Sequence, residues 1–292
     1  MTNETSEWQI SDNTSTDPII SAILGASSVH TTEIESDSMF KTVIVADKAS
    51  RSQYDLLIEA SQNNITIPHG TVCLACTGEN FHGFRNRHWE APVGNIYLSV
   101  YFTPNIKIEN TGFAFTVLAA VSVIDTLETI GRLTGRAGIK WVNDILIDDS
   151  KVSGFLTHTY SENDIMTGAV IGIGLNVESA PSIEPTPFVP KAACLNDYIA
   201  SIPISRKEAL TKLLESIESN YNVLINNGSQ KLINLYREKS IVIGRQAIIY
   251  ADNPNAKSEI IAKGTIKRIG DNLELYLDSQ KEPITRGRLA FI

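Results

Sequence analysis

The most informative stretch of the chain is IKWVNDILIDDSKVSG, residues 139–154. It contains two short apolar segments, 139–141 and 145–147, followed by the turn residues Asp148-Asp149-Ser150 and a third extended segment that begins at residue 151. Short apolar runs that are separated by turn residues favour antiparallel strands over a helix. The stretch therefore predicts a group of short paired strands near the middle of the chain.

The polar residues between these strands could carry chemistry. Asn143 and Asp144 follow a Lys-Trp pair, and a second lysine, Lys151, opens the returning strand. An aspartate beside a lysine can hold Mg²⁺ or steady an amine, and the ammonium of Lys151 could meet a developing negative charge. An Asn-Asp turn with lysines on its rim explains the same residues without any function.

The segments on either side extend this unit into a larger sheet with helices. Further strands are predicted at 40–46, 71–76, 96–102 and 165–177. Helices are predicted at 51–62, 111–133 and 205–226, with a short one through Leu232 and Tyr236. Ser50 is expected to cap the first helix, and Ser205 with Glu208 the third. The pattern predicts an α+β fold, a mixed β-sheet with helices packed on one side of it.

Sequence character divides the chain into three parts. Residues 1–38 form a polar N-terminal tail, in which 18–25 predicts a short helix. Residues 39–239 hold the mixed pattern of strands and helices and form the main domain. Residues 240–292 change to short strands separated by turns, which predicts a small all-β barrel.

The composition excludes several classes of protein. The 292 residues carry a net charge of −8, which disfavours a broad nucleic-acid surface. The most apolar segment, 113–124, is interrupted by Thr116 and Ser122 and falls short of the roughly 18 apolar residues of a membrane span. Three cysteines do not make a disulfide framework, and the N-terminus lacks a signal-peptide pattern, so we expect a cytoplasmic protein.

In this acidic chain, the basic loop GENFHGFRNRHWEAPVG, residues 78–94, stands out. Its cationic side chains are His82, Arg85, Arg87 and His88, and its aromatic ones are Phe81, Phe84 and Trp89. Arginine forks bind phosphate or carboxylate, so the loop is expected to close over an anionic ligand. A solvated basic loop is the alternative interpretation.

The segment IGIGLNV, residues 171–177, is the third candidate. Gly172 and Gly174 leave one face of a predicted strand bare, which invites a ligand or another backbone, and Asn176 ends the strand beside that space. Tight sheet packing explains the glycines equally well. Cys73 and Cys76 are predicted to point to opposite faces of their strand and are interpreted as buried thiols.

Four segments, taken together, resemble the biotin protein ligases of the biotin/lipoate ligase family. KWVNDI (140–145) is similar to the family's Lys-Trp-Pro-Asn-Asp-Leu, and KVSGFL (151–156) to its Lys-x-x-Gly-Ile-Leu. GIGLNV (172–177) resembles Gly-x-Gly-x-Asn-Val, and WEAPVGNIYLS (89–99) resembles Trp-x-Ser-Pro-x-Gly-Asn-Leu-Tyr-Leu-Ser. The resemblance covers residues 40–292 and implies a ligase domain followed by an SH3-like barrel.

The resemblance implies an ATP-dependent biotin protein ligase. In this family a carboxylate attacks the α-phosphate of ATP, giving an acyl-adenylate and pyrophosphate, and a lysine of a carrier protein then attacks the mixed anhydride. The implied substrates are biotin and ATP with Mg²⁺. The implied partner is the biotin carboxyl carrier domain of a carboxylase, with a homodimer, no nucleic acid and no membrane.

By the same resemblance, catalysis rests on Lys151, Asp144 and Arg87, and Asp144 orients the incoming lysine or holds Mg²⁺. The implied biotin contacts are Ser50, Arg51, Ser52, His82, Gly83, Phe84, Lys151 and Gly154. The implied ATP and adenylate contacts are Arg85, Arg87, Trp89, Lys140, Asn143 and Asn176.

The basic loop is also where the chain departs from the family. Residues 81–89, FHGFRNRHW, align with Gly-Arg-Gly-Arg-x-Gly-Arg-x-Trp and match only at Gly83, Arg87 and Trp89. Phe84 replaces the arginine that holds the adenylate, and Ser50-Arg51-Ser52 replaces the family's Ser-Thr-Asn biotin contact. The resemblance thus supports the reaction type more strongly than the acyl substrate.

Other functions stay open on the sequence alone. A lipoyl or octanoyl ligase or transferase is one, because octanoyl transferases of this fold use a cysteine in this region and Cys194 lies 18 residues beyond Asn176. Their His-Gly-Pro-Gly signature is absent, however, and CLND (194–197) resembles the Cys-x-Asn-Asp of eukaryotic-type biotin ligases, so Cys194 is interpreted as structural. A biotin-binding homologue that has lost adenylation is another, favoured by Phe84. A repressor is disfavoured, because the polar N-terminal segment does not resemble a winged helix.

Overall fold

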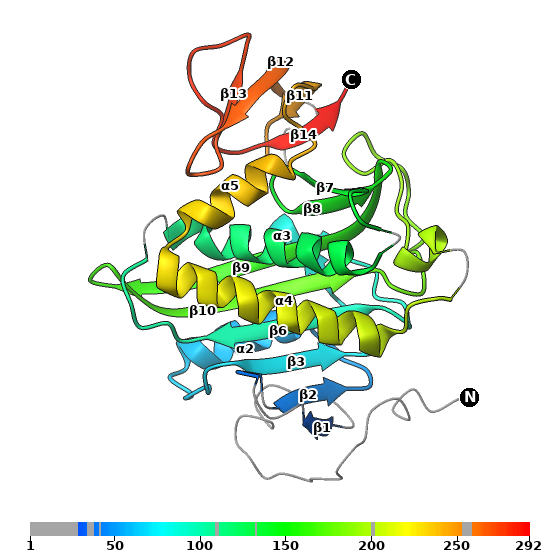
Figure 1. The fold of residues 1–292 in the computed structure, drawn as a ribbon, viewed down its shortest axis with the longest axis vertical. Coiled ribbons are helices and arrows are strands. Elements are labelled where there is room, and N and C mark those ends of the chain that lie inside the picture. The colour runs from blue at the N-terminus through cyan, green and yellow to red at the C-terminus, as the bar shows by residue number, and fades with distance from the viewer. Residues whose placement is uncertain are drawn as a thin grey trace.

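The computed structural model describes residues 29–33, 38–40, 42–108, 111–131, 133–199, 202–252 and 259–292. The helix predicted at 18–25 and most of the predicted tail lie outside these residues. The described chain forms an eight-stranded sheet covered by helices and a four-stranded sheet at one end of the molecule (Figure 1). The predicted α+β fold is confirmed.

The large sheet is mixed and has the strand order β1-β2-β3-β6-β10-β9-β8-β7. Its strands are β1 (Val29–Glu33), β2 (Thr42–Ala46), β3 (Thr71–Ala75), β6 (Ile96–Phe102), β7 (Ala137–Lys140), β8 (Asp144–Ile147), β9 (Ser150–Glu162) and β10 (Ile165–Leu175). β2 and β3 are parallel, and the other neighbours are antiparallel. The strands predicted from residues 139–154 are β7, β8 and the start of β9, at one edge of the sheet.

The first strand of the sheet was not expected. β1 lies inside the segment predicted as a polar tail and pairs antiparallel with β2, with Val29 opposite Ala46 and Glu33 opposite Thr42. An edge strand pairs on one side only, and edge strands of natural proteins are often short and polar, so they can lack the apolar run that marks an inner strand. The polar sequence VHTTE therefore gave no strand signal.

Helices cover both faces of the sheet, which corrects the prediction that they pack on one side. α3 (Thr111–Thr129) and α4 (Arg206–Asn227) lie over one face, and α2 (Gln53–Gln62) lies over the other (Figure 1). Successive side chains of a strand point to opposite faces. In β6, Leu98 and Phe102 join the core beneath α3, whereas Tyr101 joins the cluster beneath α2.

α3 is the central helix of the core. Its segment Gly112–Thr129 has a mean hydropathy of 1.4, which is enough for a membrane span by length and composition alone, but 67% of it is buried inside the protein. A helix that packs between a sheet and a second helix needs apolar residues on most of its surface. We therefore interpret α3 as a core helix.

The two predicted helix caps have different outcomes. The hydroxyl of Ser205 accepts a hydrogen bond from the backbone N–H of Glu208 at 3.1 Å, as predicted for the start of α4. α2, however, begins at Gln53, so Ser52 rather than Ser50 occupies its N-cap position. The Ser50 carbonyl instead accepts a hydrogen bond from the side-chain amide of Asn80.

The C-terminal residues form a four-stranded antiparallel sheet, consistent with the predicted barrel. Its strands are β11 (Gln246–Tyr250), β12 (Ile260–Ile269), β13 (Leu275–Leu277) and β14 (Arg288–Phe291), in the order β13-β12-β11-β14. We call residues 240–292 the barrel. It follows α5 (Gln230–Glu238) and lies beyond the β7–β8 edge of the large sheet (Figure 1).

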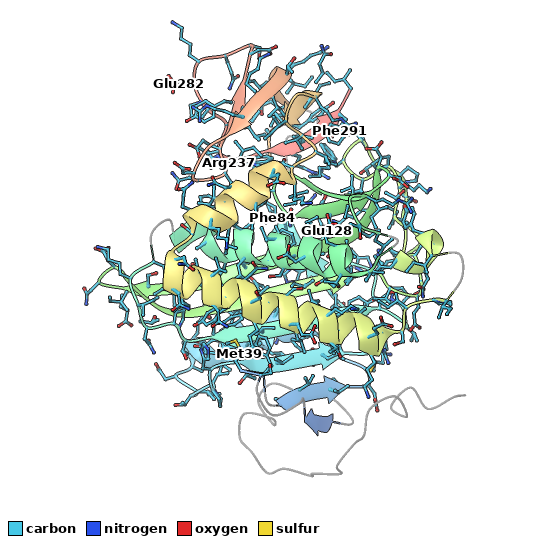
Figure 2. All side chains as sticks on the ribbon, in the orientation of Figure 1. Met39, Phe84, Glu128, Arg237, Glu282 and Phe291 are labelled. Atoms are coloured by element: carbon cyan, nitrogen blue, oxygen red, sulfur yellow. The ribbon has the colours of Figure 1, made fainter. Side chains whose placement is uncertain are left out.

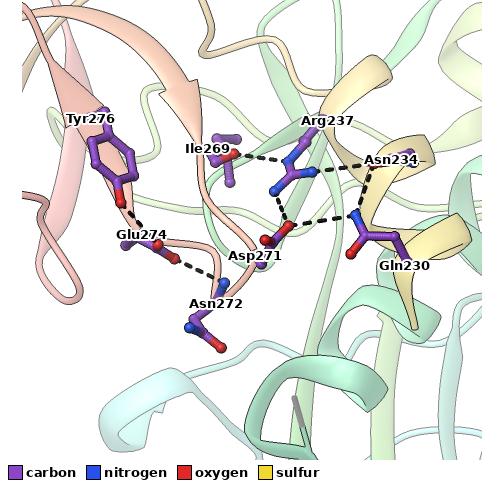
Figure 3. Close-up of polar contacts among 8 residues, drawn as sticks. All are labelled: Gln230, Asn234, Arg237, Ile269, Asp271, Asn272, Glu274 and Tyr276. Carbon is purple, nitrogen blue, oxygen red and sulfur yellow. Dashed lines mark hydrogen bonds and ion pairs between the residues drawn. The ribbon is translucent and has the colours of Figure 1, made fainter. Parts of the chain in front are cut away.

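Polar contacts fix the barrel to the rest of the chain. Arg237, which Figure 2 shows at the end of α5 beneath the barrel, donates through Nε to the carbonyl oxygen of Ile269 at 2.8 Å and pairs with Asp271 at 2.6 Å (Figure 3). The Trp141 indole donates a buried hydrogen bond to the Leu273 carbonyl at 2.6 Å. The barrel is thus docked beside the strands that carry the predicted site.

Candidate active site

A cavity of about 260 Å³ lies on the face of the sheet that carries α2. Tyr54 of α2 forms one wall, and the strand segments around Gly154 and Gly172 form the floor. The cavity collects most of the residues that the sequence singled out: Ser52, His82, Gly83, Phe84, Arg87, Trp89, Asn143, Asp144, Lys151, Gly154 and Asn176. Their assignment to biotin or ATP stays a prediction.

Lys151 and Asp144 form an ion pair in the wall of this cavity. The turn between β8 and β9 folds the chain back on itself, and Lys151 Nζ lies 2.5 Å from Asp144 Oδ1. The two side chains are only 19% and 18% exposed. The ammonium also lies 5.0 Å from the centre of the Trp89 ring, a distance at which an aromatic face attracts a cation. These contacts therefore fix the Lys151 ammonium in the cavity wall, beside the carboxylate of Asp144.

Trp89 covers Gly154 and Gly174, the second of which is one of the two glycines that the sequence marked as a bare strand face. A Cβ atom on Gly174 would lie 2.5 Å from Trp89 Cζ2, and one on Gly154 would lie 3.0 Å from Cζ3. Tyr54 covers Gly172 in the same way, at 3.0 Å. The glycines thus make room for aromatic side chains that line the cavity, rather than for another backbone.

Two buried polar atoms in the cavity wall have no hydrogen-bond partner among the described residues. Asn176 donates through Nδ2 to the Ala193 carbonyl at 3.0 Å, which leaves its Oδ1 unpaired. The indole Nε1 of Trp89 is also unpaired. Buried polar groups normally have partners, so an unpaired acceptor and an unpaired donor that line one cavity indicate a polar ligand.

The basic loop is anchored to α2. It forms a small hairpin of β4 (His82–Gly83) and β5 (Arg87–His88), joined by a 3-10 turn at Phe84–Asn86 in which Arg85 and Asn86 have positive φ. The imidazole of His82 contacts the Asp55 carboxylate of α2 at 2.9 Å. This contact fastens the hairpin over the cavity, while residues 84–88 are exposed to solvent, as the alternative interpretation expects.

Four predicted site residues do not line this cavity: Ser50, Arg51, Arg85 and Lys140. Ser50 is exposed, and Arg51 pairs with Glu59 on the outer surface of α2. Arg85 pairs with Asp252 of the barrel at 2.6 Å and lines a neighbouring cavity. The charged groups of Arg51 and Arg85 are thus engaged elsewhere, and the ligand contacts assigned to these four residues stay predictions.

Lys140 is buried beside the cavity and does not line it. Its side chain is 3% exposed, and its ammonium donates to the carbonyl oxygen of Phe188. Burial lowers the pKa of Lys140 to about 8, although the nearby Asp144 carboxylate opposes the shift. Lys140 therefore holds the segment that contains Phe188 against the sheet.

Several residues that line the cavity were not predicted from the sequence as site residues. They are Gln53 and Tyr54 of α2, Glu90 of the basic loop, Pro181, Ile183, Glu184, Thr186, Val189 and Ala192 of the connection after β10, and Arg288 of the barrel. The proline-rich connection 181–190, which follows the Asn-Val motif directly, was the one usable signal. Nothing in the local sequence marks Arg288.

The three cysteines, all of which the structure describes, form no disulfide and are buried, as predicted. Cys73 joins the apolar cluster beneath α2 and Cys76 the core on the other face, and burial raises the pKa of Cys73 to about 12. Burial also raises the pKa of Cys194, which does not line the cavity. A reactive cysteine needs an accessible thiolate, so these surroundings disfavour Cys194 as a nucleophile.

Among the described residues, no cluster of three or more His, Cys, Asp or Glu side chains could hold a metal ion. Asp144 offers one carboxylate, and Lys151 already contacts it. Mg²⁺ at nucleotide sites is typically held by substrate phosphates and one or two carboxylates. The site therefore fits a Mg²⁺ ion that arrives with a nucleotide and does not fit a resident metal.

Comparison with known proteins places this geometry in a family. Residues 49–176, which contain all four motif segments apart from the last residue of GIGLNV, match the biotin/lipoate A/B protein ligase family. The chain is 30% identical to the bifunctional ligase/repressor BirA of Bacillus subtilis over 187 residues, which is 64% of this chain and 56% of that protein. It is 25% identical to the biotin–acetyl-CoA-carboxylase ligase of Mycobacterium tuberculosis over 84% of this chain and 86% of that protein.

The structure gives an independent match. The biotin protein ligase of Aquifex aeolicus, solved in complex with biotin and ATP, superimposes with a TM-score of 0.65 at 21% identity, over 85% of this chain and 97% of that one. The chain spans just over half the length of the B. subtilis relative. Residues 49–176 therefore match the biotin/lipoate A/B protein ligase family, within a chain that has the fold of the biotin protein ligases.

Proposed function

We propose that the chain is an ATP-dependent biotin protein ligase, which forms biotinyl-5'-AMP and transfers biotin to a lysine of a carrier protein. The observation that carries the proposal is the Lys151–Asp144 ion pair in a cavity that Arg87 also lines. The motif segments that surround this pair match the family, and a relative over most of the chain is named a biotin–acetyl-CoA-carboxylase ligase.

The first step brings two anions together. A carboxylate oxygen of biotin attacks the α-phosphorus of ATP, and the bond to the bridging oxygen breaks, so that pyrophosphate leaves with the electron pair. Fixed cations lower the barrier, because they offset repulsion between the carboxylate and the phosphates and stabilise charge in the transition state. The Lys151 ammonium, held by Asp144 and by the Trp89 face, is one such cation.

The second step needs a group that receives an amine. The uncharged amine of the carrier lysine attacks the acyl carbon, the carbon–oxygen bond to AMP breaks, and the amine gives up a proton. Asp144 is the carboxylate in the cavity wall beside Lys151, so it is suited to orient the incoming lysine. Asn143, whose side chain donates to the Phe155 carbonyl at 2.9 Å, stiffens the turn that holds Asp144.

The unpaired polar atoms support a nucleotide in the same cavity. A purine edge offers both donors and acceptors, which could satisfy Asn176 Oδ1 and Trp89 Nε1. The indole also provides a flat face for a base. Mg²⁺ would accompany the ATP phosphates as part of the substrate, with Asp144 as its nearest carboxylate in this proposal.

A related acyl group is the second candidate substrate. The cavity wall includes the aromatic side chains Tyr54, Phe81, Phe84 and Trp89. Phe81 packs so closely over Gly78 that a Cβ atom there would lie 2.2 Å from its ring. Such apolar walls also suit a lipoyl or octanoyl chain, and Phe84 in place of a family arginine suits a homologue that binds biotin without adenylation.

The remaining parts of the proposal concern the acceptor protein, the oligomeric state and the cellular compartment. We propose the biotin carboxyl carrier domain of a carboxylase as the acceptor, a homodimer as the assembly, and the cytoplasm as the compartment. The names of the ligase relatives support the acceptor, and the three buried cysteines, which form no disulfide, support a reducing compartment. Binding to nucleic acid or membranes forms no part of the proposal.

The test is transfer of biotin to a carrier domain. The chain, biotin, Mg²⁺, ATP and a biotin carboxyl carrier domain are incubated, and biotin on the carrier is detected with streptavidin. We expect labelling that requires ATP, that Lys151→Ala abolishes and that Cys194→Ala leaves intact. Labelling that persists in Lys151→Ala but disappears in Cys194→Ala, or that does not require ATP, would instead support a transferase.

A further inference from the structure

We propose that Asp55 of α2 and Asp252 of the barrel are positioning residues, which hold the tip of the basic loop, residues 82–88, over the cavity. They thereby limit the rates at which the acyl substrate enters and leaves. The inference rests on the proposed function for the identity of that substrate. Neither aspartate was predicted from the sequence as a site residue, and Asp252 lies outside the segment 49–176 that matches the ligase family.

Two ion pairs attach the loop tip to two different parts of the structure. His82 lies 2.9 Å from the Asp55 carboxylate of α2, and Arg85 Nε lies 2.6 Å from Asp252 Oδ2 of the barrel. The Asp252 side chain is only 9% exposed, and that of Asp55 is partly buried. Solvent and salt screen such pairs less than they screen fully exposed ones. In both pairs the loop supplies the cation and its surroundings supply the anion.

The contact between His82 and Asp55 has the geometry of a charged pair. His82 Nε2 lies 2.9 Å from a carboxylate oxygen of Asp55, and Nδ1 lies 3.1 Å from the carbonyl oxygen of Gly83. A carbonyl and an ionised carboxylate can only accept hydrogen bonds, so an imidazolium, which has an N–H on both nitrogens, satisfies both contacts. Charge-assisted hydrogen bonds are stronger than neutral ones, which suits this contact to hold the loop.

The loop tip needs such outside contacts, because its hairpin is very short. Its strands β4 and β5 contain two residues each, and Arg85 and Asn86 between them have positive φ. Even longer two-stranded hairpins are only marginally stable by themselves, and a non-glycine residue with positive φ adds a conformational cost. The closed position of the tip therefore depends on the contacts with α2 and the barrel.

Residues 82–84 of the loop tip form a wall that two cavities share. They line the cavity of the candidate site and also a neighbouring cavity of about 400 Å³, whose other walls include Phe113 of α3 and Arg286 of the barrel. A displacement of the tip would open the first cavity into the second. A substrate that passes this way must wait for the tip to move, so the two ion pairs slow its entry and its release in the same proportion.

The kinetics of biotin binding test this role in the full chain. Stopped-flow tryptophan fluorescence is suitable, because Trp89 lines the cavity. Asp55→Ala and Asp252→Ala are each expected to raise both the association and the dissociation rate constant about threefold to tenfold, as expected for loss of a partly buried ion pair. The Kd should stay nearly unchanged, because the ion pairs form with and without substrate. A variant that merely distorted the site would weaken the Kd without faster association.

Three further variants serve as controls. Glu59→Gln removes an exposed ion pair with Arg51 from the same helix without touching the loop, so its rate constants should equal those of the wild type. Asp55→Glu keeps the carboxylate and should restore slower binding and release. In a His82→Ala background the pair is already broken, so Asp55→Ala should cause no further acceleration.

Hydrogen exchange tests the loop without any substrate. The Trp89 N–H donates to the Phe81 carbonyl at 2.9 Å and closes the base of the loop tip. Mass spectrometry of the peptide that covers the tip should show exchange in Asp55→Ala and Asp252→Ala that is faster than in the wild type by about the same factor as the rate constants.

The proposal is overturned if exchange and binding rates in both alanine variants equal those of the wild type, or if the Kd for biotin weakens at an unchanged association rate. Its failure is distinguishable from failure of the proposed function. If exchange accelerates as expected but the chain adenylates no acid, the positioning role stands and the ligase assignment fails. If the chain adenylates biotin while both variants bind and release it like the wild type, the opposite holds.

Discussion

At the residue scale, the site depends on a few side chains that the sequence could identify and on others that it could not. Lys151 and Asp144 lie seven residues apart in a turn-rich stretch, so local pattern was enough to bring them together. Arg288 meets Lys151 in the same cavity only through the docking of the barrel. Long-range packing of that kind leaves no trace in local spacing, which is why sequence reasoning missed it.

Gly174 tests whether the position of the Trp89 ring matters for binding. A Cβ atom in Gly174→Ala would lie 2.5 Å from the indole, so the ring must move. Overpacking of this kind costs about 1–3 kcal/mol in the free energy of unfolding. We also expect weaker ATP binding, measured by calorimetry. Gly131→Ala, where a Cβ atom meets nothing within 4 Å, is the control, and equal ATP affinity in both variants would contradict the role of Trp89.

Lys140 predicts a pH dependence of stability. Its pKa is about 8 in the folded chain and 10.5 ordinarily. Between these values the unfolded chain binds more protons than the folded chain, so this residue makes the free energy of unfolding rise as the pH rises from 8 to 10.5. Urea unfolding should therefore show that the wild type gains stability relative to Lys140→Met across this range.

The control for this titration is Lys207→Met, which removes an exposed lysine of α4. Its stability difference from the wild type should not vary between pH 8 and 10.5. A difference between wild type and Lys140→Met that is constant over the same range would show that Lys140 does not titrate as expected. A constant offset alone would reflect only the lost hydrogen bond to Phe188.

At the scale of secondary-structure elements, the sequence predicted which elements exist better than where they pack. β6 spans Ile96–Phe102, as expected, because its run of apolar residues is bounded by polar segments. The position of α2 on the opposite face could not be inferred, since a strand that is buried on both faces reads the same whichever helix covers it. The edge strand β1 lacked an apolar pattern altogether.

The contacts between α5 and the barrel predict that a weaker attachment of the barrel also weakens nucleotide binding. Arg237→Ala removes the hydrogen bond to Ile269 and the ion pair with Asp271. We expect a loss of about 1–3 kcal/mol in the free energy of unfolding. We also expect a higher KM for ATP with little change in the KM for biotin. The reason is that the barrel places Arg288 in the cavity wall, and a guanidinium is suited to the phosphate oxygens of ATP.

Arg136→Ala serves as the comparison for this variant. Arg136 pairs with Asp148 at a more exposed site away from the junction, and exposed ion pairs contribute about 0–1 kcal/mol. Steady-state kinetics with varied ATP and varied biotin separate the two effects. If Arg237→Ala alters both KM values equally, the barrel acts on general stability and not on the phosphate end of the site.

At the scale of the whole molecule, the site is assembled from parts that lie far apart in the sequence. The sheet supplies Lys151, the residue after β10 is Asn176, the basic loop supplies Trp89 and Arg87, and the barrel supplies Arg288. Core residues of the large sheet and of the barrel belong to one continuous apolar cluster. The division into domains at residue 239 stays a prediction, and the cavity draws on both sides of it.

The central claim is that this cavity joins a carboxylate to the α-phosphate of ATP, and exchange of labelled pyrophosphate into ATP measures that step directly. The account predicts exchange by the full chain that requires biotin and Mg²⁺ and disappears in Lys151→Ala. Exchange that depends on lipoate or octanoate would reassign the acyl substrate. The claim would be contradicted by the absence of exchange with any of these acids while ATP and biotin both bind.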